Sequence, residues 1–214
     1  MSSSCYVSDL FYYPVKSLKG INIDTALVDD FGICYDRRFM FVDDENKFIT
    51  QRSHPQLSQL SVSLKQSSLH SISTLTIFSD ELGRLDFDIH EFARSACGTS
   101  KVLLWNDYVD AVVLKSQITK RLSKCLGINV RLAFMPDSSF RQVDRVYFSE
   151  DKRVSFADGY PFLLTSDESL KDLNSRLKTS IPMSNFRPNI VISGGLSAYA
   201  EDAWKKMFIG GISF

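Results

Sequence analysis

The feature of the sequence that most restricts its fold is a series of short, strand-like runs separated by turn residues in its N-terminal part. The runs are apolar, and some, such as "INIDTALV", alternate apolar and polar positions. Alternation with period two is typical of strands, and turn residues follow at "DDFG", "DDENK" and "SDELG". We therefore expect strands at 6–13, 21–28, 39–43, 48–51, 60–64, 74–78 and 84–88. Many short strands at this spacing favour an antiparallel barrel or sandwich.

After further strand-like runs at 101–104 and 107–114, helical spacing appears. The apolar residues of "QITKRLSKCL" (117–126) recur at helical intervals, and Gly127 follows where a helix-ending glycine belongs. This pattern predicts a short amphipathic helix. A boundary between two domains is most consistent with this change of pattern, and we place the domains at 1–114 and 115–214.

A second helix is expected after Thr165. Thr165 and Glu168 fit a capping box, and three leucines that follow at helical spacing share one face: Leu170, Leu173 and Leu177. The segments "FRPNIVISGG" and "FIGGISF" each read as a further strand. The sequence thus predicts a mixed, mainly β (α+β) fold with short helices.

The charge balance excludes a long-range electrostatic function. Lys and Arg number 25 and Asp and Glu number 25, so no field of one sign draws the chain to nucleic acid or to an anionic membrane. The N-terminus lacks the pattern of a signal peptide, and no run approaches the roughly 18 apolar residues of a membrane span. We expect a cytoplasmic protein that binds neither nucleic acid nor membrane.

The cysteines and histidines predict no metal site. Cys5, Cys34, Cys97 and Cys125 are widely spaced and form no CxxC pair, and the three histidines have no distinctive setting. The glycine-rich nucleotide motifs, G-x-S-x-G and H-E-x-x-H are missing from the sequence as well. Nucleotide-binding and zinc-hydrolase functions lose most of their support.

Several basic and polar residues nevertheless interrupt apolar, strand-like runs. They are Lys16 with Ser17 in "YYPVKSLKG", Arg37 with Arg38 in "YDRRFMFVD", Arg52 in "FITQR", and Arg187 with Asn189 in "NFRPNIVISG". Buried charges are costly unless they are paired or bind an anion, so several of these residues could converge on a bound phosphate. The structural alternative is an ion pair between Asp36 and Arg37. A polar segment, 137–153, carries Arg141, Arg145, Lys152 and Arg153, and we interpret it as a long exposed connector.

Five segments, in this order, resemble proteins in which a MOSC N-terminal β-barrel domain precedes a MOSC domain (molybdenum cofactor sulfurase C-terminal domain). They are "YYPVKSLKGI", "DRRFMFVDDENKFITQRSHPQLSQL", "FADGYPFLLTSDESLKDLNSRL", "FRPNIVISGG" and "AEDAWKKMFIGGISF". The chain is similar to bacterial reductases of N-hydroxylated compounds and to the mitochondrial amidoxime-reducing component. The resemblance implies an N-terminal β-barrel followed by a partial MOSC β-barrel.

The resemblance also implies a cofactor, molybdopterin, and the residues that contact it. Lys16, Ser17 and Arg37 match the residues that bind it, and Lys and Arg form charge-assisted bonds with a phosphate monoester. Asp158, Gly159 and Tyr160 of "FADGYP", together with Arg187 and Asn189 of "FRPN", match residues that line the pterin pocket. The alternatives without a binding role are a turn at Asp158-Gly159 and a helix-to-strand junction at Arg187-Pro188. Pyridoxal phosphate binding is implied only at the level of the family.

The sequence departs from the family pattern at its C-terminal end. Relatives continue past the "IG" strand to a cysteine that ligates molybdenum, whereas this sequence ends at Phe214, and none of its four cysteines lies in that motif. Two functions therefore stand. One is the parent activity, reduction of hydroxylaminopurines and amidoximes with electrons from a redox partner protein. The other is a non-catalytic module that binds pterin, a substrate or a partner.

Overall fold

The computed structural model describes residues 5–68, 71–94, 98–114, 117–146 and 150–214. The chain divides into two units of discontinuous sequence. The larger unit comprises Tyr12–Ile21 and Ala26–Pro161, and the smaller unit comprises Met1–Phe11, Asn22–Thr25 and Phe162–Phe214. Each unit is described by itself below. The mixed, mainly-β fold class predicted from the sequence is confirmed.

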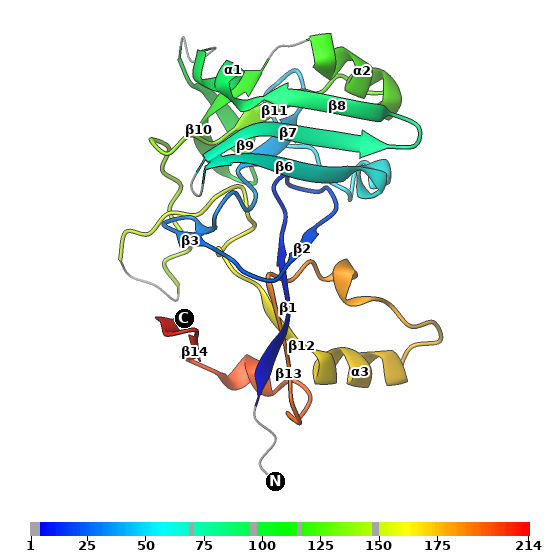
Figure 1. Ribbon diagram of the computed structural model, residues 1–214, viewed down its shortest axis with the longest axis vertical. Helices are drawn as coiled ribbons and strands as arrows, with labels where there is room; N and C mark the ends of the chain where they lie inside the picture. The colour runs from blue at the N-terminus through cyan, green and yellow to red at the C-terminus, as the bar shows by residue number, and fades with distance from the viewer. Residues whose placement is uncertain (1–4, 69–70, 95–97, 115–116, 147–149) are drawn as a thin grey trace. The chain divides into compact units, whose positions relative to one another are not determined.

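The larger unit contains two antiparallel sheets (Figure 1). The 4-stranded sheet has the order β5-β11-β10-β9 and the 3-stranded sheet the order β6-β7-β8. The strands are β5 (Phe39–Val42), β6 (Ser61–Ser68), β7 (Ser71–Ser79), β8 (Gly83–Asp88), β9 (Ser100–Leu104), β10 (Asp107–Leu114) and β11 (Arg131–Phe134). A small hairpin of β3 (Val28–Asp29) and β4 (Gly32–Ile33) is also present, with the helices η1 (Pro55–Gln59), α1 (Ile89–Arg94) and α2 (Gln117–Leu126).

Three clusters of buried hydrophobic side chains lie in this unit. In β7 and β8 the inward-facing Leu75, Ile77 and Phe87 are fully buried, as the period-two pattern requires. They belong to the same buried cluster as Phe39 of β5 and Leu122 of α2. Burial of each such side chain is worth about 1.5–3 kcal/mol. In Figure 1, α1 and α2 lie beside the strands of this unit.

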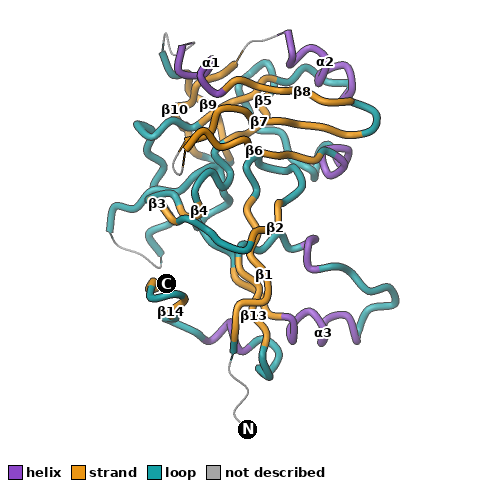
Figure 2. The backbone as a smooth tube through the Cα atoms, viewed as in Figure 1, coloured by secondary structure: helices purple, strands orange, loops and turns teal. Residues whose placement is uncertain are grey.

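The smaller unit is built on a 4-stranded sheet with the order β12-β13-β1-β2. Its strands are β1 (Tyr6–Tyr12), β2 (Ile21–Ile23), β12 (Leu164–Ser166) and β13 (Ile190–Ser193). β12 and β13 run parallel, and the connection between them contains α3 (Asp167–Ser175) and the short helix η2 (Met183–Asn185). The chain continues through η3 (Ala200–Ala203) to a hairpin of β14 (Phe208–Ile209) and β15 (Ile212–Ser213), as the tube of Figure 2 shows.

Most of the expected elements are present, with several differences. The helix expected at 117–126 is α2, and its bounds are confirmed. The strand expected at 48–51 is wrong, because only Phe48 pairs, in a bridge with Val42, and a turn follows. The run 21–28 forms two short strands, and "FIGGISF" forms a hairpin at Gly210-Gly211, where both glycines have positive φ. β11 was not expected, because the adjacent Leu132 and Ala133 are both buried and give no alternation.

The cap expected for α3 is shifted by one residue. Ser166, and not Thr165, is the N-cap: its Oγ accepts a hydrogen bond from the backbone N–H of Ser169 at 3.1 Å. The Glu168 carboxylate turns instead to the backbone N–H groups of Gly194 and Gly195, each at 3.1 Å. The capping-box interpretation was therefore wrong in its register, although the helix itself is present.

In the part of the chain that the structure describes, no helix combines the length and the hydropathy that a membrane crossing demands.

Candidate functional site

The position of Lys16 in the larger unit is fixed by a short backbone pairing with β5. Val15 forms a parallel bridge with Phe39, and the backbone N–H of Lys16 donates to the Phe39 carbonyl at 2.8 Å. Val15 and Leu18 on either side are fully buried, and Ser17 adopts a left-handed φ of 69° that turns the chain. The apolar neighbours therefore bury Lys16, whose residue exposure is only 7%.

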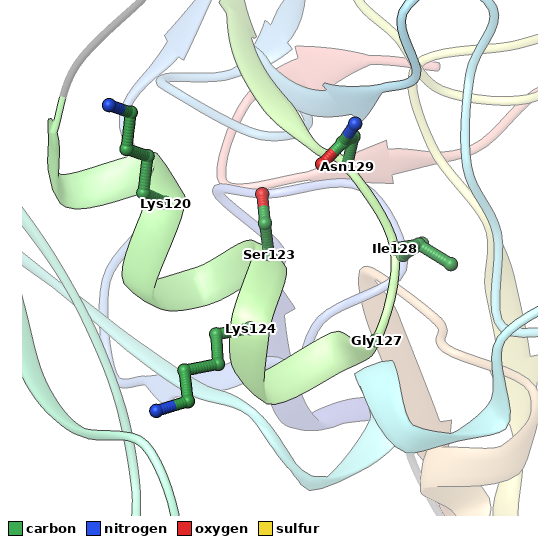
Figure 3. A pocket seen from close by; sticks show the side chains of 6 residues that line it. All are labelled: Lys120, Ser123, Lys124, Gly127, Ile128 and Asn129. Atoms are coloured by element: carbon green, nitrogen blue, oxygen red, sulfur yellow. The ribbon is translucent and has the colours of Figure 1, made fainter.

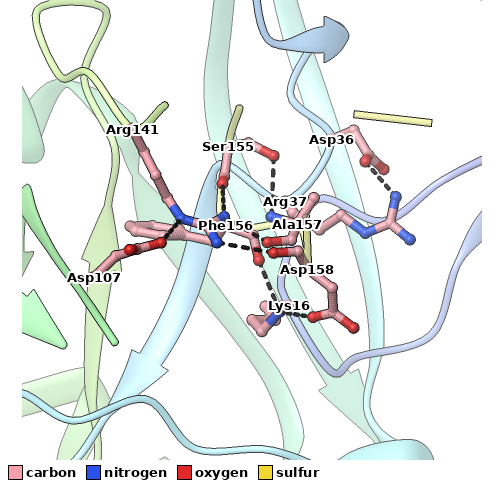
Figure 4. Close-up of polar contacts among 9 residues, drawn as sticks. All are labelled: Lys16, Asp36, Arg37, Asp107, Arg141, Ser155, Phe156, Ala157 and Asp158. Atoms are coloured by element: carbon pink, nitrogen blue, oxygen red, sulfur yellow. Dashed lines mark hydrogen bonds and ion pairs between the residues drawn. The ribbon is translucent and has the colours of Figure 1, made fainter. Parts of the chain in front are cut away.

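The Lys16 ammonium has two oxygen partners. It donates to the Phe156 carbonyl at 2.8 Å and to Asp158 Oδ1 at 2.6 Å (Figure 4). Burial lowers the pKa of Lys16 from 10.5 to about 8, because loss of hydration outweighs the attraction of the Asp158 carboxylate. Asp158 is the exposed member of the pair, with 68% of its side chain accessible. At neutral pH the lysine is therefore largely protonated and pairs with a carboxylate that can move into solvent.

Arg37 contacts the same backbone segment through its own backbone. Its carbonyl accepts a hydrogen bond from the Phe156 N–H at 2.9 Å, and its own N–H donates to the Tyr13 carbonyl at 2.8 Å. The guanidinium pairs with the buried Asp36 and lies over the Tyr13 ring, 4.5 Å from its centroid. Tyr13 in turn packs so closely on Gly20 that a Cβ there would overlap the ring. The Asp36–Arg37 ion pair considered from the sequence is thus present.

Arg141 shapes the segment that faces Lys16, and its burial corrects the sequence interpretation. Its guanidinium donates to the carbonyls of Ser155, Ala157 and Asp158 at 3.0, 2.7 and 2.8 Å. Its Nε donates to Asp107 Oδ2 at 2.8 Å (Figure 4). The segment 137–153 was expected to be an exposed connector, which is wrong for Arg141, since only 7% of this residue is exposed. The neighbouring Val143, also buried, was the available sequence signal.

An aromatic residue beside Lys16, Trp105, was missed in the sequence. Trp105 occupies the turn between β9 and β10 with a positive φ of 56°. The Lys16 Nζ lies 5.8 Å and the Arg52 Cζ 5.2 Å from the centroid of its ring. A bulky residue with positive φ is uncommon, and this backbone feature cannot be read from composition or periodicity. The Trp105 ring is therefore shared by two cations.

The two residues after Asp158, Gly159 and Tyr160, are less tightly packed than Lys16 and Arg141. The Tyr160 hydroxyl donates to the Asp144 carbonyl at 2.9 Å, and 37% of Tyr160 is exposed. Among the described residues, nothing lies within 4 Å of the position of a Cβ on Gly159. Lys16, Ser17, Arg37, Asp158, Gly159 and Tyr160 all belong to the larger unit.

Arg187 and Asn189 belong to the smaller unit. Arg187 has a positive φ of 58° just before Pro188 and β13. Asn189, 1% exposed, accepts a hydrogen bond from the Leu163 N–H at 3.2 Å and donates one to the Phe11 carbonyl at 3.2 Å. Its amide thus joins two segments of this unit, and its contact with a pterin stays a prediction.

The donor set of the larger unit fits a phosphate monoester. The Asp158 carboxylate reports the local field: partial burial alone would raise its pKa, but the charges of Lys16, Arg37 and Arg52 hold the pKa below its usual value. A place where several cations stabilise one exposed carboxylate also stabilises a phosphate oxygen. The molybdopterin phosphate therefore suits these residues.

No metal-ligating group is evident in the described residues. Burial raises the pKa of Cys34 to about 11 and also raises the pKa values of Cys5 and Cys125, so these thiols are protonated at neutral pH. Cys97 lies outside the described residues. The described part of the chain contains no cluster of three or more His, Cys, Asp or Glu side chains suited to a metal ion.

Two hollows of the larger unit involve none of the predicted site residues. One, of about 460 Å³, lies at the C-terminal end of α2 and is lined by Lys120, Ser123, Lys124, Gly127, Ile128 and Asn129 (Figure 3). There Ser123 Oγ accepts a hydrogen bond from the Val130 N–H at 3.0 Å, which links the residues after Gly127 to the helix. The other, of about 360 Å³, includes Cys34, Arg38 and Asp137.

The fold and these sequence segments define the class of protein: the chain belongs to the MOSC family. The MOSC N-terminal beta barrel domain matches residues 4–129, and the MOSC domain matches residues 151–214. The family predicted from the five sequence segments is thereby confirmed.

Several curated proteins are similar to this chain over almost its whole length. It is 32% identical over 221 residues to mitochondrial amidoxime-reducing component 1 of Mus musculus, covering 96% of this chain and 60% of that protein. The Homo sapiens protein of the same name is 29% identical over 221 residues, covering 96% of this chain and 61% of that protein. A molybdenum cofactor sulfurase of Oryza sativa subsp. japonica is 26% identical over 228 residues, covering 99% of this chain and 27% of that protein. The chain thus spans about 60% of the length of its amidoxime-reducing relatives.

Proposed function

We propose that the chain binds the molybdopterin form of the molybdenum cofactor and that the Lys16 ammonium is the main cation for its phosphate. The observation that carries this proposal is the asymmetry of the Lys16 pair. The ammonium is buried and fixed by the Phe156 carbonyl, whereas the carboxylate facing it is mostly exposed. A buried cation whose anionic partner can leave suits exchange with a phosphate.

The other cofactor-binding residues are proposed around this cation. Ser17 adds a hydroxyl next to Lys16, and Arg37 adds a guanidinium held by Asp36 and by the Tyr13 ring. Asp158, Gly159 and Tyr160 of the larger unit and Arg187 and Asn189 of the smaller unit are proposed to line the pterin. Support for the residues of the larger unit comes from the backbone of Phe156. Its carbonyl accepts a hydrogen bond from Lys16, and its N–H donates to the Arg37 carbonyl.

The proposed activity of the protein is reduction of N-hydroxylated compounds such as amidoximes and hydroxylaminopurines. Support comes from the amidoxime-reducing relatives, whose similarity extends over 96% of this chain. When bound, the cofactor supplies the molybdenum centre for removal of oxygen, and a redox partner protein supplies the electrons. The chain itself contributes binding and orientation: Lys16 holds a proton at neutral pH, and Arg37 is held in place by its ion pair.

Cofactor binding tests the proposal directly. The purified chain is incubated with molybdopterin, with and without its phosphate, and retained pterin is measured by fluorescence after oxidation. Loss of the Lys16 charge in Lys16→Gln should weaken binding of the phosphorylated form by about 1.5–3 kcal/mol, the range for hydrogen bonds to charged groups. This corresponds to roughly 10- to 100-fold. The dephosphorylated form should bind wild type and variant alike.

Controls separate this effect from unfolding. Lys19→Gln changes an exposed lysine of the same segment and should leave binding unchanged. For Arg37 the suitable variant is Arg37→Lys, because Arg37→Ala would leave the buried Asp36 without its cation and destabilise the fold. Equal pterin retention by wild type and Lys16→Gln would refute the phosphate role.

Cofactor-loaded protein is then assayed with an amidoxime and a chemical reductant, and retention of pterin without turnover would favour a binding module.

A further inference from the structure

Arg52 lies in a separate turn, and hydrogen bonds of this turn hold it close to Lys16. The turn is closed by the backbone N–H of His54, which donates to the Thr50 carbonyl at 2.8 Å. The side chain of Gln51 donates from Nε2 to the Ser17 carbonyl at 2.8 Å. This bond ties the turn to the residue that follows Lys16. Arg52 therefore keeps a defined position relative to the phosphate-binding segment.

Trp105 sets the direction of the Arg52 side chain. The guanidinium lies 5.2 Å from the centroid of the Trp105 ring, within the range of a cation–π interaction. Phe48 packs against the same ring with its centroid 4.7 Å away and an interplanar angle of 60°. Among the described residues, no carboxylate forms an ion pair with Arg52. An aromatic ring thus holds this guanidinium while its charge stays available.

Asp158 is the carboxylate on which these cations act. Its Oδ1 lies 2.6 Å from the Lys16 ammonium, and the charges of Lys16, Arg37 and Arg52 lower its pKa although partial burial alone would raise it. The backbone carbonyl of Asp158 is fixed separately by Arg141 at 2.8 Å. With 68% of its side chain exposed, the carboxylate can rotate into solvent while the backbone stays in place.

We propose that Arg52, positioned by Trp105, is a second cation of the Lys16 phosphate site and that the Asp158 carboxylate is an internal anion displaced by the bound phosphate. This inference rests on the proposed function in one respect, namely that Lys16 takes part in phosphate binding. A phosphate dianion carries more charge and more acceptor oxygens than one carboxylate, so it binds two cations better. The carboxylate leaves because two anions cannot share the site without repulsion.

The proposal predicts opposite changes in phosphate affinity for Arg52→Gln and Asp158→Asn. Binding of inorganic phosphate to the wild-type chain and its variants is measured by calorimetry at constant pH and low salt. Arg52→Gln should weaken binding about tenfold, at the lower end of the scale of one hydrogen bond to a charged group. Asp158→Asn removes the competing charge and should tighten binding by a similar factor. Two matched controls, Arg84→Gln and Asp110→Asn, change exposed, paired residues of β8 and β10 and should leave affinity unchanged.

Trp105 is a positioning residue, so its test asks whether a conservative aromatic substitution restores the phosphate binding that a non-aromatic substitution loses. Trp105→Leu should weaken phosphate binding like Arg52→Gln, and Trp105→Phe should restore most of it, with equal thermal unfolding of the two variants. Unchanged affinity in Arg52→Gln, or weaker binding in Asp158→Asn, would overturn the inference and leave the role of Lys16 intact. Equal phosphate binding by wild type and Lys16→Gln would overturn the proposed function as well.

Discussion

The Lys16 ammonium donates to the backbone carbonyl of Phe156 at 2.8 Å, although the two residues lie 140 positions apart. The N–H of the same residue, Phe156, donates to the Arg37 carbonyl at 2.9 Å. Two basic residues from the N-terminal part of the chain are therefore held by one residue close to "DGYP". This arrangement makes the conformation of the segment 155–158 decisive for the site.

Removal of the Arg141 guanidinium should destabilise the larger unit. In Arg141→Met the carbonyls of Ser155, Ala157 and Asp158 lose their donor, and each buried unsatisfied group costs about 1–3 kcal/mol. We expect a loss of about 3 kcal/mol in the free energy of unfolding, measured by urea denaturation. Arg145→Met is the matched control, since its side chain is 59% exposed and exposed ion pairs contribute little. Equal losses in both variants would contradict the role of Arg141.

Lys16 should make stability rise with pH above neutrality. Its pKa is lowered from 10.5 to about 8 by burial, with Arg37 and Arg141 adding to the effect and Asp158 opposing it. Between these two values the unfolded chain binds more protons than the folded chain, so the free energy of unfolding increases with pH. At about 1.36 kcal/mol per pKa unit, the rise between pH 7.5 and 10 should be roughly 2 kcal/mol.

The comparison of wild type with Lys16→Met isolates this contribution. The raised pKa of Cys34, due first to burial, acts in the opposite direction in both proteins, so the difference between the two pH profiles is the relevant quantity. Urea unfolding at several pH values gives both profiles. Lys19→Met, which changes an exposed lysine, should follow the wild-type profile. Parallel profiles for wild type and Lys16→Met would show that Lys16 has an ordinary pKa.

Anion binding should show the reverse pH dependence. Sulfate keeps both negative charges throughout the range used, so a change in its affinity reports the protein. As the pH rises through about 8, Lys16 loses its proton and sulfate binding should weaken, by roughly tenfold if one charged hydrogen bond is lost. Calorimetric titrations at pH values on both sides of 8 give the profile. Lys16→Arg should keep its affinity to higher pH, because arginine stays charged. A flat wild-type profile would exclude Lys16 from the site.

The cap of α3 can be tested by comparing neighbouring residues. In Ser166→Ala the N–H of Ser169 loses its acceptor, and a lost N-cap costs about 1 kcal/mol. The loss should be larger here, because Ser166 is fully buried and also donates to Glu201 Oε1 at 2.8 Å. Thr165→Val, which removes the hydroxyl of the residue expected from the sequence to be the cap, should change stability much less. Thermal unfolding of the two variants decides between the two positions.

The sequence by itself determined the features that depend on neighbours along the chain. Strand alternation located β7 and β8, helical spacing with Gly127 located α2, and the motifs around Lys16 and Arg37 indicated the family. Only the tertiary structure decided which partners the charges have. Arg141 is polar and lies in a polar segment, yet it is buried because the carbonyls of Ser155, Ala157 and Asp158 accept its hydrogen bonds. Trp105 and Arg52 meet because two separate turns bring them together. Local periodicity follows from backbone geometry, whereas these contacts depend on chain segments that meet only after folding.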